Sequence, residues 1–496
     1  MKDSTVRDIA LMALRNLGRH RVKTIITTTA VAISVALYIF IDGWLLGMNL
    51  ESRRNIVSYE TGAAKIQTNA YFAKKDELPM YESFTGAEEL SAKLTAAGYD
   101  SAPRFVFSGT LYSREGTAPM VFNAVDPVKE AKLLRYVPYI EAGRFPEPGK
   151  REIAVGTLSA AKLRIGIPER PEKAEFDSEI LGAATNEEEA AFVRSFYTEN
   201  TDGTLSVKKD GNAADRDRLW KLLAATGRMT VRISTVIDMK DADKPGAIRH
   251  VNQLIDATVV GVINSPNPKT NANVAYLPID ALQDESGMML GGKVTEILIR
   301  ASDAKDSVLP QGKETPERIL TALGSALPTE LALRGWKDYT GDYFAASAQD
   351  NVTSRIMIIM LFILSFIGIA NTMLMAILER TKETGMLRAL GMTDSQVLLA
   401  YVIEAGCIGA IGSIIGILIG CLINIPMVVY GIDYSAMSKE MSGDYGYRIV
   451  AYFRSAWNPL VIILSGVVAT ILSAASAIPP TLRALKMPVT DSLRFE

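Results

Sequence analysis

Four long apolar runs are the feature that most constrains how this chain can fold. They cover residues 25–46, 354–378, 397–429 and 458–482. A helix needs about 20 apolar residues to cross the roughly 30 Å of hydrocarbon in a bilayer, and it satisfies its backbone hydrogen bonds internally. Each run reaches that length. We therefore expect a membrane protein with four transmembrane α-helices.

Basic residues beside these runs predict the orientation. Residues 1–24 hold six lysines or arginines and two aspartates, and residues 483–496 include Arg483, Lys486 and Arg494. Because basic residues gather on the cytoplasmic side, we expect both termini in the cytoplasm of a bacterium and a multi-pass chain in its inner membrane. The first run is interpreted as a retained helix, since it is longer than a signal-peptide core and no small-x-small site follows it.

The runs divide the chain into segments with alternating environments. In order, we expect a cytoplasmic segment (1–24), helix 1 (25–46), a large extracytoplasmic domain (47–353), helix 2 (354–378), a cytoplasmic loop (379–396), helix 3 (397–429), an outer loop (430–457), helix 4 (458–482) and a cytoplasmic tail (483–496). Leu45 to Tyr59 and Tyr343 to Arg355 lack proline, so helices 1 and 2 are expected to extend outward as a stalk.

The extracytoplasmic domain is predicted to be α+β. Two segments, Thr157–Leu163 and Thr315–Leu323, have helical spacing, and the charged stretch at about 168–227 is interpreted as an inserted, solvated lobe. Apolar stretches bounded by turn residues predict strands at Arg104–Tyr112, Ala118–Val125, Glu152–Val155, Val231–Ile237, Ala257–Ile263 and Val294–Ile299.

Composition excludes several classes of function. The net charge is −2 without blocks of like charge, so no nucleic-acid partner is expected. His20 and His250 are the only histidines, and they are predicted on opposite sides of the membrane, so no histidine-based metal site or catalytic triad is expected. Cys407 and Cys421 lie within an apolar run and predict no disulfide framework. We expect a non-catalytic chain without a metal.

The sharpest signal is the loop that follows helix 2, Leu378-Glu-Arg-Thr-Lys-Glu-Thr-Gly-Met-Leu-Arg-Ala-Leu-Gly-Met392. It predicts a short amphipathic helix with Met386, Leu387 and Leu390 on one side, and Gly391 suits a left-handed C-cap. Thr393 and Gln396 have the spacing of a capping box that starts helix 3. The alternative, an amphipathic connector lying on lipid, is less favoured.

This loop resembles the FtsX-like permease family, which includes MacB-type exporters and LolC/LolE lipoprotein-release permeases. The segments Gly368–Thr372, Ala13–Leu17 and Glu152–Gly156 are also similar to the family, whereas Thr384 departs from its usual isoleucine and the lobe at 168–227 has no counterpart. The family pattern E-R-x-x-E-x-G-x-x-R-A-x-G is met by Glu379, Arg380, Glu383, Gly385, Arg388, Ala389 and Gly391.

The resemblance implies a mechanotransmission scheme. The loop, with Met386, Leu387 and Leu390 added to the matching positions, would dock on a cytoplasmic ABC ATPase, and ATP hydrolysis would move a MacB-like periplasmic core domain. A second copy or a paralogous permease would complete a dimer. The sequence contains no G-x-x-x-x-G-K-[ST] motif, so this chain is expected to carry no cofactor, and ATP and Mg²⁺ would bind the partner ATPase.

Small and polar residues mark the expected helix packing in the bilayer. Gly412, Gly416 and Gly420 align on one face of helix 3, and we favour packing on helix 4 of the same chain over packing on another subunit. Asn371 is expected to bond between helices. The charge of Glu404 within helix 3 is expected to be paired with an arginine such as Arg380 rather than to transfer protons.

The resemblance leaves three candidate functions. Lipoprotein release or translocation is favoured, and the alternatives are export of a peptide or drug with a periplasmic adaptor and regulation of cell-wall hydrolases. The size of the outer domain argues against the last. The sequence leaves open the substrate and the choice between homodimer and heterodimer.

Overall fold

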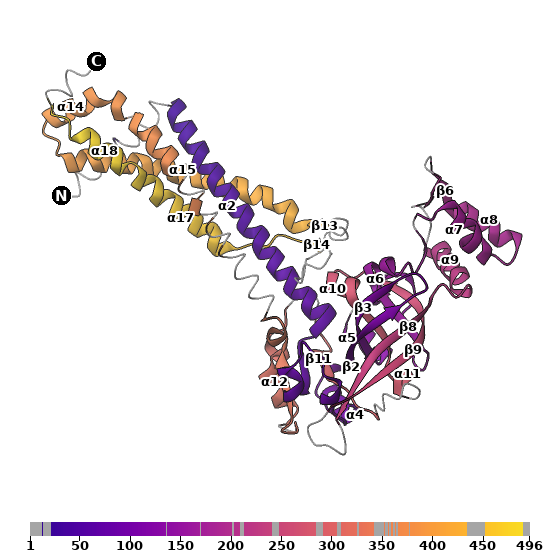
Figure 1. The fold of residues 1–496 in the computed structure, drawn as a ribbon. Helices are drawn as coiled ribbons and strands as arrows, with labels where there is room; N and C mark the ends of the chain where they lie inside the picture. Colours follow the sequence, from indigo (N-terminus) through magenta and orange to yellow (C-terminus); the bar gives the residue numbers. More distant parts are fainter. Residues whose placement is uncertain are drawn as a thin grey trace. The chain divides into compact units, whose positions relative to one another are not determined.

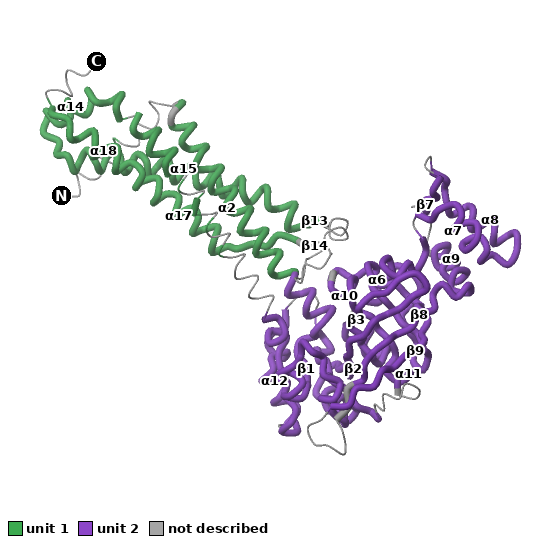
Figure 2. Tube along the Cα trace, viewed as in Figure 1, with its two compact units in different colours: residues 1–51, 344–433, 452–496 green, residues 52–343, 434–451 purple. Residues whose placement is uncertain are grey.

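The computed structural model describes residues 21–341, 366–433 and 452–489, apart from short gaps within them, and a few single residues elsewhere. The chain divides into two compact units (Figure 2). The first contains residues 1–51, 344–433 and 452–496, and the second contains residues 52–343 and 434–451. We call them the membrane unit and the β unit.

The membrane unit is built from helices (Figure 1). They are α2 (Arg21–Ile56), α14 (Thr381–Ala389), α15 (Asp394–Val429), α17 (Pro459–Ser476) and α18 (Ile478–Leu485), with a short pair of strands, β13 (Ile432–Asp433) and β14 (Tyr452–Phe453). α2 continues into the β unit and ends in a π-helical turn, η1 (Val57–Thr61).

Among the described residues, three helices are long and apolar enough to cross a membrane: Thr24–Thr61, Asp394–Val429 and Pro459–Leu485. They include the predicted helices 1, 3 and 4. The predicted helix at 354–378 falls partly outside the described residues, and its described end forms the shorter apolar helix Phe366–Glu379. A fourth crossing therefore stays a prediction.

The β unit is organised by one ten-stranded sheet. Its strands are β1 (Ala64–Thr68), β2 (Tyr99–Tyr112), β3 (Thr117–Val125), β4 (Ile140–Gly143), β5 (Glu152–Gly156), β8 (Thr230–Lys240), β9 (Ile248–Ile263), β10 (Val274–Pro278), β11 (Glu296–Ala301) and β12 (Leu331–Gly335). Strands β2, β3, β10, β5, β9 and β8 pair in that order, and β8 returns to pair with β2. These six strands therefore close into a barrel, whose interior is filled by apolar side chains such as Phe107, Phe122 and Ile233.

Strand β2 belongs to two parts of this sheet. Its second half closes the barrel against β8, and its first half pairs with β11, beyond which lie β1 and β12. Helices α4 (Ala87–Ala96) and α12 (Pro316–Ala322) contribute Leu94 and Ile319 to an apolar cluster with Ile66 and Ile297. Because side chains alternate along a strand, the neighbours of Ile66 on β1 face the opposite side of the sheet.

The charged stretch at 168–227 folds as a lobe of short elements. It contains α7 (Lys173–Glu175), η4 (Phe176–Ile180), η5 (Leu181–Ala183), α8 (Glu187–Phe196), the hairpin β6 (Tyr197–Glu199) with β7 (Leu205–Val207), and α9 (Ala213–Ala225). Phe176, Val193 and Trp220 are buried in the same apolar cluster that fills the barrel. The lobe is therefore packed and is more than a solvated surface.

The remaining helical elements connect the strands. They are α3 (Asn69–Ala73), η2 (Met80–Glu82), α5 (Pro127–Leu133), η3 (Val137–Tyr139), α6 (Thr157–Lys162), α10 (Pro268–Asn273), α11 (Ile279–Gln283), η6 (Gly312–Glu314) and η7 (Trp336–Tyr339). The six predicted strands are all present, although β2 begins five residues and β9 nine residues before the predicted starts. The two predicted helices correspond to α6 and α12.

Candidate functional site

The amphipathic helix predicted after helix 2 is present as α14. Arg380 lies at its N-cap, outside the helix, and its side chain reaches back to Glu404 of α15, with Nη1 3.1 Å from Oε2. Both side chains are buried. Next to this pair the hydroxyl groups of Thr384 and Tyr401 lie 2.9 Å apart. The pairing of Glu404 expected from the sequence is therefore present, and it fixes the start of α14 to α15.

A second group of contacts fixes the end of α14. Arg388 donates from Nη1 to the carbonyl oxygen of Met487 at 2.9 Å, and its Nε lies 2.9 Å from the carboxylate of Asp394. Its side chain is only 15% exposed. Arg388 thus connects the end of α14 to the chain after α18 and to the start of α15. Its guanidinium is therefore already bonded within the chain.

The turn between α14 and α15 has the predicted caps. Gly391 follows the helix with φ of +100°, a backbone conformation that glycine adopts without the strain of a Cβ. Thr393 and Gln396 form the capping box at the start of α15, and the backbone N–H of Thr393 donates to Gln396 Oε1 at 2.9 Å. These contacts define one conformation for the connection.

What α14 leaves exposed is a mixed apolar and polar surface. Met386 is 55% exposed and Leu390 is 79% exposed, and they lie one turn apart on the helix. Lys382, Glu383 and Ala389 are also exposed, whereas Gly385 is buried and Leu387 is half-buried. Of the predicted docking residues, Met386 and Leu390 are therefore the large apolar ones that a partner could cover.

The glycine strip of α15 packs within the chain, on α2. A Cβ at Gly412 would lie 2.9 Å from the carbonyl oxygen of Thr28, and one at Gly416 would lie 2.6 Å from that of Ala32. A Cβ at Gly420 would meet Ala36 at 3.0 Å. Packing of this strip on helix 4 is therefore wrong, since α2 occupies that face.

Gly409 and Asn371 are two further small or polar positions of the membrane unit. Gly409, which precedes the strip, is the glycine that approaches α17, because a Cβ there would lie 2.5 Å from Ser473. Asn371 is exposed and makes no hydrogen bond to the described residues, so its role between helices stays a prediction.

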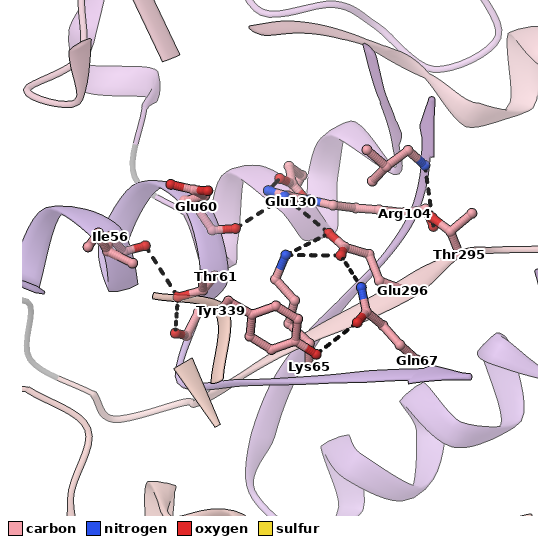
Figure 3. A network of polar contacts seen from close by, with 12 residues as sticks. Ile56, Glu60, Thr61, Lys65, Gln67, Arg104, Glu130, Thr295, Glu296 and Tyr339 are labelled. Atoms are coloured by element: carbon pink, nitrogen blue, oxygen red, sulfur yellow. Dashed lines mark hydrogen bonds and ion pairs between the residues drawn. The ribbon is translucent and has the colours of Figure 1, made fainter. Parts of the chain in front are cut away.

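The β unit contains a polar cluster that the sequence analysis missed (Figure 3). Lys65 Nζ lies 2.9 Å from Glu296 Oε2, and Gln67 donates to the same carboxylate oxygen at 2.8 Å. Arg104 pairs with Glu130, and its Nη1 is 3.6 Å from Glu296. The side chains of these four ionisable residues are at most 10% exposed.

Burial and the neighbouring charges shift the pKa values of Lys65 and Arg104. Desolvation lowers the pKa of Lys65, and the charge of Glu296 counteracts that shift in part. For Arg104, burial alone would lower the pKa, but the Glu130 carboxylate outweighs it, so the pKa lies above its ordinary value. A hint was present in the sequence, because polar Lys65 and Gln67 alternate with apolar Ala64 and Ile66, but that pattern is also typical of an exposed strand face.

Comparison with known proteins identifies the membrane part. Residues 355–489, which include α14, α15, α17 and α18, match the FtsX-like permease C-terminal family. Residues 355–489 of the chain therefore belong to the C-terminal part of the FtsX-like permease family. The chain is 34% identical over 140 residues to the ABC transporter permease YtrF of Bacillus subtilis, which covers 27% of the chain and 30% of YtrF.

Two further relatives bear names of different functions. The chain is 27% identical over 358 residues to the macrolide export ATP-binding/permease protein MacB of Agrobacterium fabrum, covering 68% of the chain and 50% of MacB. It is 20% identical over 181 residues to the lipoprotein-releasing system transmembrane protein LolC of Haemophilus influenzae, covering 36% of the chain and 42% of LolC. The chain thus spans half or less of the length of each of these three relatives.

Among solved structures, the extracellular domain of the noncanonical ABC-type transporter YknZ from Gram-positive bacteria is similar at 11% identity with a TM-score of 0.28. The match covers 55% of the chain and 99% of the YknZ domain.

Proposed function

We propose that this permease is the membrane subunit of an ABC transporter, in which an ATPase docks on α14 and ATP hydrolysis moves the β unit through α2. The observation that carries the proposal is the exposed pair Met386 and Leu390 on a helix whose two ends are fixed. Large apolar side chains exposed together on a short helix are a common contact surface for a partner protein.

The fixed ends of α14 give the docking surface a mechanical role. Arg380 connects its start to Glu404 in α15, and Arg388 connects its end to Asp394 and to Met487. Force applied at α14 would therefore act on α15. Since the glycine strip packs α15 tightly on α2, displacement of α15 would be transmitted to the helix that leads into the β unit.

The ATPase is proposed to be a separate polypeptide. No G-x-x-x-x-G-K-[ST] motif occurs in the 496 residues, so the backbone cradle that binds nucleotide phosphates in P-loop enzymes is lacking in this sequence. ATP and Mg²⁺ would then bind the partner, and this chain would be a non-catalytic subunit. Two permease copies, or one copy with a paralogue, would form the dimer.

For the substrate, we propose release or translocation of a lipoprotein from the outer face of the inner membrane. The relationship to LolC supports this choice. The second candidate is export of a peptide or drug with a periplasmic adaptor, which the relationship to MacB over 68% of this chain favours. Both assignments place the β unit outside the cell membrane and both termini in the cytoplasm.

The docking surface is tested by changing its apolar residues to charged ones. We expect Met386→Asp and Leu390→Asp each to lower recovery of the co-expressed ATPase in a pull-down at least tenfold, because a carboxylate would be desolvated at the contact. The matched control is Leu254→Asp, which changes a 60% exposed leucine of β9 in the β unit. Full ATPase recovery with both α14 variants would contradict the docking role.

The orientation is tested by labelling single cysteines in intact cells. After both native cysteines are replaced by alanine, Leu254→Cys should react with a membrane-impermeant maleimide, and Leu390→Cys should react only after the cells are opened. Equal protection of both positions would place the β unit inside the cell and end the proposal.

The two substrates are separated by what co-purifies with the complex. Lipoprotein release predicts acylated proteins bound to the permease with an ATPase variant that cannot hydrolyse ATP, and these proteins should be lost when Leu390→Asp is added. Export predicts instead a periplasmic adaptor subunit and no acylated cargo.

A further inference from the structure

The β unit contains a cavity of about 330 Å³ on the sheet face that carries the polar cluster. Its wall includes side chains from β1, β11, β2, β3 and β10, in the order of the sheet, and residues of η1. This volume is within the range of sites that bind small molecules. All lining residues belong to the β unit, and α14 is not among them.

The charges around the cavity are balanced by one another. Lys65 pairs with Glu296 and Arg104 with Glu130, and on the η1 side Lys269 Nζ lies 2.8 Å from Glu60 Oε1. At the more exposed part of the wall, Lys75 and Asp76 again contribute one charge of each sign. The wall itself contains four basic and three acidic side chains, and Glu130, which pairs with Arg104 outside the lining, makes the two signs equal in number, so no excess charge is left to attract an anion or a cation.

Two neutral groups in the wall still have hydrogen-bonding capacity. Asn123 is 7% exposed and lines the cavity, and its side-chain amide makes no hydrogen bond to the described residues. The hydroxyl of Tyr71 is buried in the wall and has no partner with ordinary hydrogen-bond geometry among those residues. An amide and a phenol can each both donate and accept. A ligand with matching donor and acceptor groups in the cavity would bond to both.

Aromatic rings supply the rest of the recognition surface. Tyr59, Tyr276 and Tyr339 line the same cavity, and the Tyr339 hydroxyl donates to Gln67 Oε1 at 2.8 Å. Aromatic side chains offer apolar faces and polar tips at once, which suits a ligand that has both C–H and hydroxyl surfaces. We propose that this cavity binds a small uncharged ligand with several hydroxyl groups, of the class of a sugar ring or a polyol.

Such a ligand would join the foot of α2 to the sheet. Tyr59, Glu60 and Thr61 of η1 line the cavity together with Asn123 of β3. Bound ligand would therefore resist separation of η1 from the sheet and would bias any motion that α2 transmits. This consequence rests on the proposed function, whereas the binding itself does not.

Binding is measured on the purified full chain in detergent, by thermal unfolding and by isothermal titration calorimetry. The neutral probes are glucose, N-acetylglucosamine and glycerol, and the charged probes are phosphate, glutamate and spermidine. We expect saturable binding of at least one neutral probe. Asn123→Leu and Tyr71→Phe should each weaken its Kd about tenfold, the effect of losing one well-formed hydrogen bond to the ligand.

Matched controls make the same chemical changes outside the cavity. Asn252→Leu alters an exposed asparagine of β9, and Tyr112→Phe alters a 43% exposed tyrosine of β2, and both should leave the Kd within about twofold. The variant Leu390→Asp should also bind the probe normally, so a failure of ATPase coupling and a failure of this site give different results.

Several outcomes would overturn the site. Saturable binding of charged probes alone would refute the ligand class, and no response to any neutral probe would mean that the cavity holds only water. An unchanged Kd in Tyr71→Phe and Asn123→Leu would place the bound probe elsewhere. Because Tyr71→Phe removes a single oxygen atom, it keeps the test open if Asn123→Leu fails to fold.

Discussion

The two units bury charged side chains in different ways. In the membrane unit Arg380 and Glu404 form a buried pair that connects the start of α14 to α15. In the β unit Lys65 and Arg104 share one sheet face with Glu130 and Glu296, and a neighbouring amide joins them. A single pair can be replaced by apolar side chains at little cost, but each member of a network supports several others. The contrast suggests that the pair fixes a position, whereas the network maintains a polar surface.

The largest loss of stability should come from changing Glu296, at the centre of the network. Glu296→Leu leaves Lys65 without its carboxylate and Gln67 without an acceptor, so we expect a loss of about 3–5 kcal/mol of unfolding free energy. Urea unfolding of the full chain in detergent, followed by circular dichroism in the strand region, would measure it. Glu89→Leu breaks an exposed pair with Lys93 and should change the midpoint little. Equal midpoints for both variants would refute the network.

The buried pair in the membrane unit should behave differently on double substitution. Glu404→Leu alone leaves Arg380 buried and uncompensated, with an expected loss of about 3 kcal/mol. Adding Arg380→Met removes the orphan cation and should recover most of that loss, because two apolar side chains can pack together in its place. Thermal unfolding in detergent would compare the three proteins. A double variant as unstable as Glu404→Leu would show that the pair is part of a larger polar system.

The same contrast explains what the sequence could predict. Long apolar runs and the turn residues Gly391 and Thr393 act locally, so the long helices, the short helix α14 and the turn between α14 and α15 follow from local sequence patterns. The six strands of the β unit were found for the same reason. Burial of Lys65 and Arg104 could not be predicted, because it depends on partners such as Glu296, which is 231 residues distant from Lys65.

Helix partners in the membrane were also beyond local reasoning. A glycine strip predicts that some helix approaches closely, but the strip on α15 carries no information about which helix that is. The partner is decided by the arrangement of the whole unit, and it is α2 that meets Gly412, Gly416 and Gly420. The closed barrel is a similar case, since β8 returns to β2 over a separation that no turn signal spans.

The glycine strip of α15 allows a test of helix packing that involves no charged side chain. Gly416→Ala would place a Cβ 2.6 Å from the Ala32 carbonyl oxygen, so α15 and α2 must separate, and we expect a loss of about 1–3 kcal/mol. The control is Gly406→Ala, whose Cβ would lie 3.6 Å from that of Ala474, an ordinary contact. Since alanine favours a helix over glycine, this control should be neutral or slightly stabilising. If the unfolding temperatures of both variants fall equally, the strip does not set the distance between the two helices.

The smallest expected effect is an acid-dependent contribution from a pair in the β unit, Glu152, whose side chain is 11% exposed, and Arg144, whose side chain is 44% exposed. Burial on its own raises the pKa of Glu152, but the Arg144 guanidinium at 2.7 Å and the backbone N–H of Glu147 at 2.9 Å outweigh it and hold the pKa below the ordinary 4.5. A carboxyl group whose pKa is lower in the folded state adds stability above about pH 4.5, and that stability is lost as the pH falls through the folded pKa.

Glu152→Gln should therefore lower stability at pH 7 by less than about 1 kcal/mol, the range of solvent-screened pairs, and the difference from the original chain should vanish towards pH 3. Arg144→Met should give the same pH profile, because it removes the other half of the pair. Unfolding midpoints measured from pH 3 to pH 7 would show whether the stability difference between each variant and the original chain depends on pH. A difference that persists unchanged at pH 3 would mean that Glu152 acts through packing. The comparison between a buried ion pair and a buried network would then depend on Glu404 and Glu296 alone.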